Sequence, residues 1–406
     1  MRFGFFHLMP YADLDLDYVK KHKSSWLTLP NSYYDPEKGA ALYHRYLDEY
    51  EYAADLGFEF LGLNEHHQTA YGMMPSPNVL AGTLARKLKG NTKIAILGRA
   101  LPVLSNPLQV AEEYAILDNL TRGRLIAGFV RGIGAEYHAL AMNPTESHAR
   151  FHEAHDLIMQ AWTRPGPFSF NGKYYKFPYV NLWPRPYAKP HPPVFIPSQG
   201  SKETIEFAAA ANHRYTYLQT AAPAAVLFKY MQAYRDEAER QGWQATPNHL
   251  AWNVKIYVGE TDAIAQREAK PHIEAFANRF QRMSMEMLLP PGYTSMTAFK
   301  NLMREKANVS RERTMEEMIS LGTFICGSPQ TVIDKLADFQ SKGGFNIVGA
   351  GLQYGTMPAD LTRKNTEMFA REVMPALINA LPGSQSLSGV HANASDLLPQ
   401  TEGFVR

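Results

Sequence analysis

The stretch that decides the fold is FEFLGLNEHHQTA, residues 58–70, in which an apolar run ends abruptly in polar residues. The run from 58 to 64 is almost continuously apolar instead of alternating, which is typical of a parallel β-strand that is buried on both faces. Glu65, His66 and His67 follow it directly. The stretch therefore predicts a central strand of an α/β protein, with an acid and two histidines at the carboxyl end of that strand.

Seven further runs of this kind are spread along the chain, which gives eight in all. They lie at residues 2–8, 58–64, 93–101, 124–130, 193–198, 215–220, 253–259 and 345–351. Amphipathic helical patterns separate them, and no long polar linker interrupts the alternation. The pattern predicts a (β/α)8 TIM barrel, with an open doubly wound sheet as the alternative.

Local signals mark the ends of several predicted helices. Residues 41–56 place apolar side chains on one face, and Gly57 then suits the end of a helix. The pairs Asn106-Pro107 and Ser328-Pro329 each suit an N-cap followed by proline at the first helical position. These signals support helices that alternate with the eight strands.

Three irregular segments follow predicted strands 1, 4 and 7, at residues 9–40, 164–192 and 281–327. The second is rich in proline, which favours an extended path over a helix. The third contains RMSMEMLLPPGYTSM, which suits either a lid over an apolar pocket or an ordinary packed helix pair. We expect all three to be insertions into one barrel domain, residues 1–382, followed by a loosely held tail, residues 383–406.

The composition argues against several classes of protein. The 406 residues include 41 basic and 39 acidic side chains, for a formal charge of +2, which gives no reason to expect a nucleic-acid or membrane partner. The start, MRFGFFHLMP, lacks the features of a signal peptide, and no run approaches the roughly 18 apolar residues of a membrane span. The single cysteine, Cys326, cannot form an internal disulfide. We therefore expect a cytoplasmic protein.

The two histidines after the second predicted strand could bind a metal, carry out proton chemistry or simply pack. Barrel enzymes place their chemistry at this end of the strands, which favours a functional role. Successive side chains of a strand point in opposite directions, so His66 and His67 are not expected to bind one metal ion together. Proton chemistry by His66 and packing stay open as alternatives.

A second group of residues suits an anion. Arg131 ends the fourth predicted strand, Arg150 opens the next long helix, and Gly200, Ser201 and Thr204 follow the fifth strand at the start of a helix. Helix-terminal N–H groups, hydroxyls and guanidinium groups together can bind a phosphate, although Ser-x-x-Thr alone is more often a helix cap. The motif GIGAEY lacks the third glycine of the dinucleotide fingerprint, so no Rossmann-type NAD(P) site is expected.

Four segments resemble a known family. They are NEHHQTAYG, LPVLSNPLQVAEEYAILDNLTRGRLIAGFVRG, SQGSKETIEFAAAA and FICGSPQTVIDKLADFQSKGGFNIV, and in this order they resemble the bacterial luciferase-like flavin monooxygenases. The resemblance runs from Phe3 to about Ala380. It implies that His66 is catalytic and lies beside the flavin ring. It also implies that the cofactor-binding residues are Asn64, Glu65, Gly98, Arg131, Arg150, Gly200, Ser201 and Thr204.

The resemblance implies a two-component monooxygenase. Reduced FMN (FMNH2) from a separate flavin reductase would react with O2 to give a C4a-hydroperoxide, which would oxygenate a small, mostly apolar organic substrate. A homodimer is usual in the family. Light emission is not implied, because Val130 stands where light-emitting members carry a cysteine and residues 9–40 are longer than in them. A deazaflavin (F420)-dependent oxidoreductase and a non-catalytic flavin-binding protein stay open as alternatives.

Overall fold

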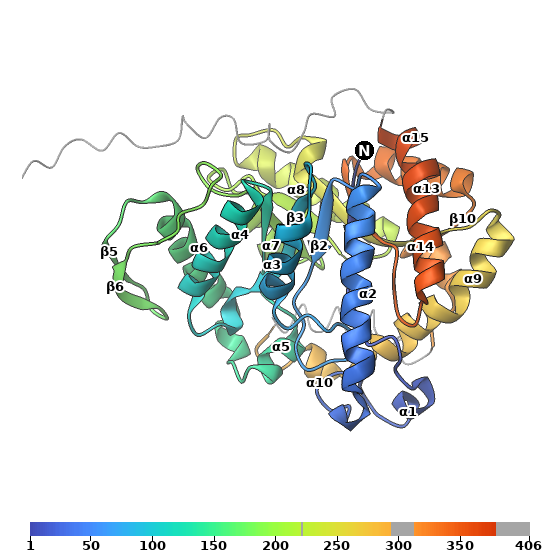
Figure 1. Ribbon diagram of the computed structural model, residues 1–406. Helices are drawn as coiled ribbons and strands as arrows, with labels where there is room; N and C mark the ends of the chain where they lie inside the picture. Colours follow the sequence, from blue (N-terminus) through green and yellow to red (C-terminus); the bar gives the residue numbers. More distant parts are fainter. Residues whose placement is uncertain (221, 294–311, 379–406) are drawn as a thin grey trace, which may run out of the picture.

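A closed barrel of eight parallel strands forms the centre of the computed structural model, which describes residues 1–220, 222–293 and 312–378 (Figure 1). Strand β11 pairs with both β1 and β9, and β8 pairs with β9, so the ring closes. All eight predicted strands are present, which confirms the TIM barrel and not the doubly wound sheet. Their bounds are β1 (Arg2–Phe6), β2 (Phe60–Leu63), β3 (Lys93–Ala100), β4 (Leu125–Val130), β7 (Val194–Ser198), β8 (Thr216–Gln219), β9 (Leu250–Val258) and β11 (Ile347–Gly351).

One further strand, β10 (Phe324–Gly327), extends the barrel sheet outside the ring. It pairs in parallel with residues 255–258 of β9, beyond residues 250–252, which pair with β8. The sequence did not predict β10, because a four-residue apolar run cannot be told from a buried loop by its periodicity.

Helices cover the outside of the barrel, as the alternating pattern predicted. The longer ones are α2 (Pro36–Asp55), α3 (Pro77–Lys87), α4 (Pro107–Thr121), α6 (Ser147–Thr163), α7 (Lys202–Ala209), α8 (Ala224–Arg240), α9 (Asp262–Ala275), α13 (Pro329–Gly343) and α14 (Ala359–Met368). Asn106 and Ser328 cap α4 and α13 as predicted, since their side chains accept from backbone N–H groups of the first turn. Helix α2 starts before the predicted residue 41, because Asp35 caps it and Pro36 takes its first position.

The core has two layers. Inside the barrel, alternate strand residues pack against one another, and the larger outer layer lies between the strands and the helices. The inner layer consists of Phe60, Ala95, Leu97, Ile126, Phe195, Leu218, Ala251 and Ile347. This filled interior means that a ligand has room only near an end of the barrel.

The three irregular segments contain short elements. Residues 164–192 hold an antiparallel hairpin, β5 (Phe168–Asn171) and β6 (Lys176–Val180), which projects at the left of Figure 1. Residues 9–40 hold α1 (Leu16–Lys20), and residues 281–327 hold α10 (Met285–Leu288) and α12 (Met315–Leu321). Short helices elsewhere include α5 (Gly134–Ala139), η5 (Phe276–Phe280) and α15 (Met374–Ile378). That the three segments are insertions stays a prediction. The predicted tail, residues 383–406, and part of the methionine-rich run lie outside the described residues.

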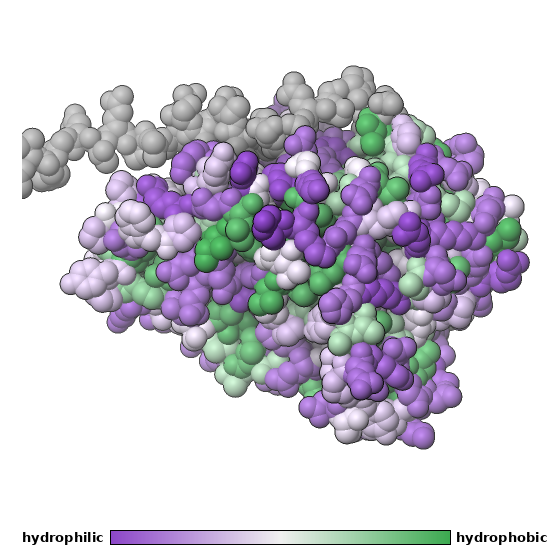
Figure 2. Space-filling view, viewed as in Figure 1, coloured by the Kyte–Doolittle hydropathy of each residue, from purple (hydrophilic) through white to green (hydrophobic). Residues whose placement is uncertain are grey.

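The face of the molecule in Figure 2 mixes hydrophilic residues with scattered hydrophobic ones, as the nearly balanced charge led us to expect. Within the ranges described above, no helix combines the length and the apolar character needed to cross a membrane.

Candidate functional site

The expected site residues gather at the carboxyl end of the barrel. Asn64 follows β2, Gly98 lies near the end of β3, Arg131 follows β4 and Gly200 follows β7. Because the strands are parallel, these ends meet on one face. In Figure 1 this face points down, toward α1, α5 and α10, while the N-terminus and α15 mark the opposite end.

His66 pairs with a buried carboxylate that the sequence did not suggest. Its Nδ1 lies 2.9 Å from Oε1 of Glu136 in α5, and Oε2 of Glu136 accepts a hydrogen bond from the backbone N–H of His67. The Glu136 side chain is only 2% exposed. A carboxylate accepts hydrogen bonds, so this geometry favours a proton on Nδ1 of His66. Its Nε2 makes no hydrogen bond within the described part of the chain.

Aromatic rings surround the His66 imidazole. Trp26 and Tyr71 each lie edge-on to it, with ring centroids 5.1 Å away. Trp26 is buried, and its Nε1 donates to the carbonyl of Phe280. The segment after β1, the loop after β2 and the chain after α9 therefore meet at His66. They make a largely apolar wall beside the His66 side chain, which is 18% exposed.

Glu65 is held by protein groups on both oxygens. Oε2 accepts from the backbone N–H of Ala100 in β3 and lies 3.4 Å from Arg99, while Oε1 lies 2.8 Å from Nε2 of His67. Burial lowers the pKa of His67, but the hydrogen bond and the charge of Glu65 raise it, and the net pKa is raised. The two imidazoles thus contact different carboxylates, although both histidines lie after the end of β2, so alternation along a strand is not the reason. Glu65 links the ends of β2 and β3, and its expected contact with a cofactor stays a prediction.

Gly98 lies at a close approach of β3 and β4. A Cβ atom at this position would lie 2.5 Å from the backbone carbon of Gly128 in β4, so any side chain would force the strands apart. The peptide bond between Leu97 and Gly98 is cis. The packing of the two strands thus accounts for the glycine, and its expected contact with the flavin stays a prediction.

Arg131 is close to the first turns of α6 and α7. Its Nη1 donates to the Ser147 hydroxyl and to the carbonyl of Tyr293, whose ring lies 4.0 Å from the guanidinium carbon. Burial lowers the pKa of His148 in α6; the charge of Arg131 lowers it further, while Glu203 in α7 raises it. Arg131, α6 and α7 are therefore near enough to interact, as a phosphate site made from them requires.

The start of α7 has the predicted cap. The Ser201 hydroxyl accepts from the backbone N–H of Thr204, lies 3.1 Å from the Thr204 hydroxyl and donates to Glu203. Gly200 precedes it with a φ of +97°, a conformation that favours glycine, and a Cβ atom there would collide with the ring of Tyr230. The structure brings these residues together at a helix N-terminus, and phosphate binding by them stays a prediction.

Arg150 has different partners from Arg131. Its guanidinium carbon lies 5.1 Å from the ring of Tyr174 and 5.3 Å from that of Tyr175, and its Nε is 3.4 Å from a carboxylate oxygen of Glu146. Both Nε and Nη1 are buried without a hydrogen bond among the described residues. Such orphaned donors suit an anion that would complete the site.

Sequence reasoning missed the residues that only the fold brings near His66. Glu136 lies in GIGAEY, which we examined only as a failed dinucleotide motif, and the acid just after a predicted barrel strand was a usable signal. Trp26 lies in an irregular segment and Tyr71 in the loop after β2, and no local pattern marks them as site residues. The same holds for Tyr293, which contacts Arg131.

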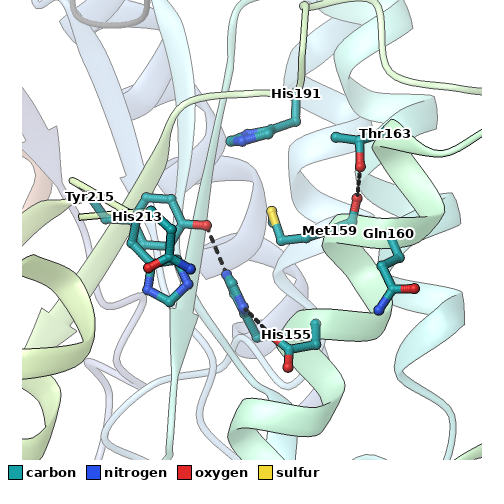
Figure 3. A pocket seen from close by; sticks show the side chains of 9 residues that line it. His155, Met159, Gln160, Thr163, His191, His213 and Tyr215 are labelled. Carbon is teal, nitrogen blue, oxygen red and sulfur yellow. Dashed lines mark hydrogen bonds and ion pairs between the residues drawn. The ribbon is translucent and has the colours of Figure 1, made fainter. Parts of the chain in front are cut away.

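A separate hollow lies at the other end of the barrel. It has a volume of about 240 Å³ and lies between α6 and the segments that lead into β7 and β8 (Figure 3). His155 in α6 is 2.9 Å from the hydroxyl of Tyr215, and His213 stacks on the Tyr215 ring. Because these segments precede their strands, the hollow faces away from His66 and is not part of the candidate site.

Comparisons with known proteins agree with this arrangement. Over 355 residues the chain is 27% identical to the oxygenase component of the flavin-dependent trigonelline monooxygenase of Acinetobacter baylyi, covering 84% of this chain and 92% of that protein. It superimposes on the oxygenating component of 3,6-diketocamphane monooxygenase of Pseudomonas putida, solved with FMN, with a TM-score of 0.67 and 18% identity over 92% of this chain and 98% of that one. An F420-dependent secondary alcohol dehydrogenase shares the fold, with a TM-score of 0.62 and 15% identity over 93% and 98% of the two chains.

A family profile decides the assignment. The profile of the luciferase-like monooxygenases matches residues 23–345, a range that contains all the candidate site residues named above. The chain therefore belongs to the luciferase-like monooxygenases, a family of flavin-dependent enzymes.

Proposed function

We propose that this protein is the oxygenase component of a two-component monooxygenase that uses FMNH2 and O2 to oxygenate a small organic substrate. The relative from Acinetobacter baylyi is named as such an oxygenase component, and a flavin reductase is then required as the partner that supplies FMNH2. A homodimer and a cytoplasmic location complete the proposal.

The residues at the carboxyl end of the barrel fit a phosphorylated flavin. Arg150 has two buried nitrogens without a hydrogen bond in the described chain, and the buried Oδ1 of Asn64 is equally without a donor there. Arg131, Arg150, Ser201 and Thr204 would hold the phosphate, and the ring would lie beside His66. When bound, the reduced flavin supplies the two electrons with which O2 is activated.

The observation that carries the proposal is the His66–Glu136 pair with its open Nε2. Glu136 fixes the orientation of the imidazole, so Nε2 can give or take a proton at one defined place. Trp26 and Tyr71 pack edge-on against the imidazole and so shield part of it from water. Helix α10, from the methionine-rich run, lies against α5, where the carbonyl of Glu286 is 3.2 Å from Nε2 of His138. This contact supports a role for α10 as part of a lid over the site.

Purified protein, FMN, a flavin reductase and NADH, supplied with isotopically labelled O2 and a set of candidate substrates, test the proposal. We expect product that contains one labelled oxygen atom. NADH loss alone is not a sufficient readout, because reduced flavin also consumes O2 without product. Turnover with F420 in place of FMN, without incorporation of oxygen, would instead support the deazaflavin alternative. Tight FMN binding with no O2 consumption would support a non-catalytic flavin-binding protein.

A further inference from the structure

A lysine lies inside the barrel on β9. Ala251 of this strand belongs to the inner core layer, and Asn253 and Lys255 share its direction because side chains alternate along a strand. The neighbouring strand β11 makes room for both. A Cβ atom at Gly349 would collide with Oδ1 of Asn253, and one at Gly351 would lie 3.4 Å from Cγ of Lys255. Lys255 is thus nearer than Asn253 to the carboxyl end, where His66 lies.

The ammonium group of Lys255 has no anionic partner in the described chain. Its Nζ lies 4.1 Å from the centroid of the Phe276 ring, and no hydrogen bond or ion pair to it exists among these residues. Burial lowers the pKa of Lys255 to about 8, and the positive charge of Arg313 contributes. Lys255 is half-buried against an aromatic ring, and a lysine in apolar surroundings is normally paired, so an ammonium group without an anion in the described chain points to an anion that binds there.

Aromatic rings connect this lysine to His66. The Phe276 ring lies 5.5 Å from that of Tyr71, and the Tyr71 ring lies 5.1 Å from the imidazole of His66. At the same end of the barrel, Oδ1 of Asn64 is buried without a donor in the described chain, and so is Oδ1 of Asn253. The mouth therefore has a cation at one side, a proton-exchanging imidazole at the other and an apolar wall between them.

We propose that Lys255 binds a carboxylate of the substrate, so that the apolar or aromatic body of the substrate lies along Phe276 and Tyr71 toward His66. This inference rests on the proposed function and narrows its substrate class from small organic molecules to organic acids. Lys255 is a specificity-determining residue in this account, because a neutral analogue would leave its charge unpaired.

Calorimetric titration with benzoate and benzamide, which share a ring and differ in charge, tests this assignment on the full-length protein without flavin. We expect the wild type to bind benzoate at least about tenfold more tightly than benzamide, from the usual strength of a charge-assisted hydrogen bond. Lys255→Met should remove this preference, and Lys255→Arg should retain most of it. Lys335→Met is the matched control, because Lys335 also lies over a phenylalanine ring, 4.9 Å from Phe339, but on α13 outside the barrel.

The inference would be overturned if the wild type did not prefer benzoate to benzamide, or if Lys255→Met kept that preference. It would also be overturned if Lys255→Met lost FMN affinity, because the lysine would then belong to the cofactor site. If Lys255→Met lowers the thermal midpoint strongly, Lys255→Gln takes its place in the same titration. Failure of the proposed function is distinguishable, because it would appear as absent FMN binding or oxygen transfer in the wild type while the benzoate preference persists.

Discussion

At the scale of single residues, the role that we propose for His66 rests on one hydrogen bond. Glu136 accepts from Nδ1, which leaves Nε2 as the nitrogen that can exchange a proton. We predict that His66→Ala binds FMN with unchanged affinity but forms about 100-fold less oxygenated product and releases peroxide instead. Product analysis together with a peroxide assay measures both quantities. An unchanged product yield would remove His66 from the mechanism.

Glu136→Gln provides a subtler test of the same contact. A glutamine can still accept from Nδ1 but carries no charge, so it keeps the position of the ring while it weakens stabilisation of a protonated imidazole. We expect a lower product yield with unchanged FMN affinity, since the charge beside the imidazole is lost while the position of the ring is kept. A product yield equal to that of the wild type would mean that Glu136 is merely structural.

Arg131 allows a direct test of the phosphate site. We predict that Arg131→Ala weakens FMN binding by at least about tenfold, because charge-assisted hydrogen bonds to the phosphate are lost. Arg164→Ala is the control: its guanidinium lies 4.2 Å from the Phe168 ring, much as that of Arg131 lies over Tyr293, but Arg164 follows the last residue of α6, at the end of that helix away from Ser147. Equal FMN affinity in the wild type and in Arg131→Ala, measured by calorimetry, would refute the assignment.

At the scale of elements, two helices start with the same cap. Ser201 caps α7 and accepts from Thr204, and Ser328 caps α13 and accepts from Thr331. We predict that Ser201→Ala and Ser328→Ala each lower the free energy of unfolding by about 1 kcal/mol. Only Ser201→Ala should also weaken FMN binding. Urea denaturation and FMN titration of both variants separate the two effects, and equal FMN affinities would reduce Ser201 to a simple cap.

The elements show how much of the fold was predictable. Strands buried on both faces left continuous apolar runs, so all eight barrel strands were found from the sequence. The helix caps at Asn106 and Ser328 were also found, since capping depends on a few neighbouring residues. Strand β10 and the β5–β6 hairpin were missed, because short strands depend on partners distant in the sequence and leave little periodicity of their own.

The site was predictable only in part, for the same reason. His66, Arg131 and Ser201 stand directly after barrel strands, and the fold then brings such positions together. Trp26 and Lys255 could not be assigned, because their contacts join segments far apart in the chain: Trp26 reaches the carbonyl of Phe280, and Lys255 reaches Phe276 only after β9 and α9 have folded.

At the scale of the whole molecule, the histidines around the hollow in Figure 3 make stability depend on pH. Burial lowers the pKa of His213 to about 4, and the neighbouring His155 contributes. As the pH falls below about 6.5, the His213 imidazole binds a proton in the unfolded chain but stays neutral in the folded chain. The free energy of unfolding should therefore decrease between about pH 6.5 and 4.

Urea unfolding at pH 7.5 and pH 5 measures this dependence. The wild type should have a lower free energy of unfolding at pH 5, by on the order of 1 kcal/mol per unit of pH below 6.5 for this one group. His213→Gln should flatten the difference, while His44→Gln, at an exposed position of α2, should leave it as in the wild type. A pH dependence that is the same in His213→Gln and in the wild type would contradict this assignment.

The central claim is that the carboxyl end of the barrel binds one FMN between Arg131 and His66. A crystal structure of the protein with FMN tests it most directly. We predict the phosphate against Arg131 and the start of α7 at Ser201, with the ring system in contact with the imidazole of His66. A flavin bound in the hollow beside His155, or anywhere else than at the carboxyl end of the strands, would contradict the account.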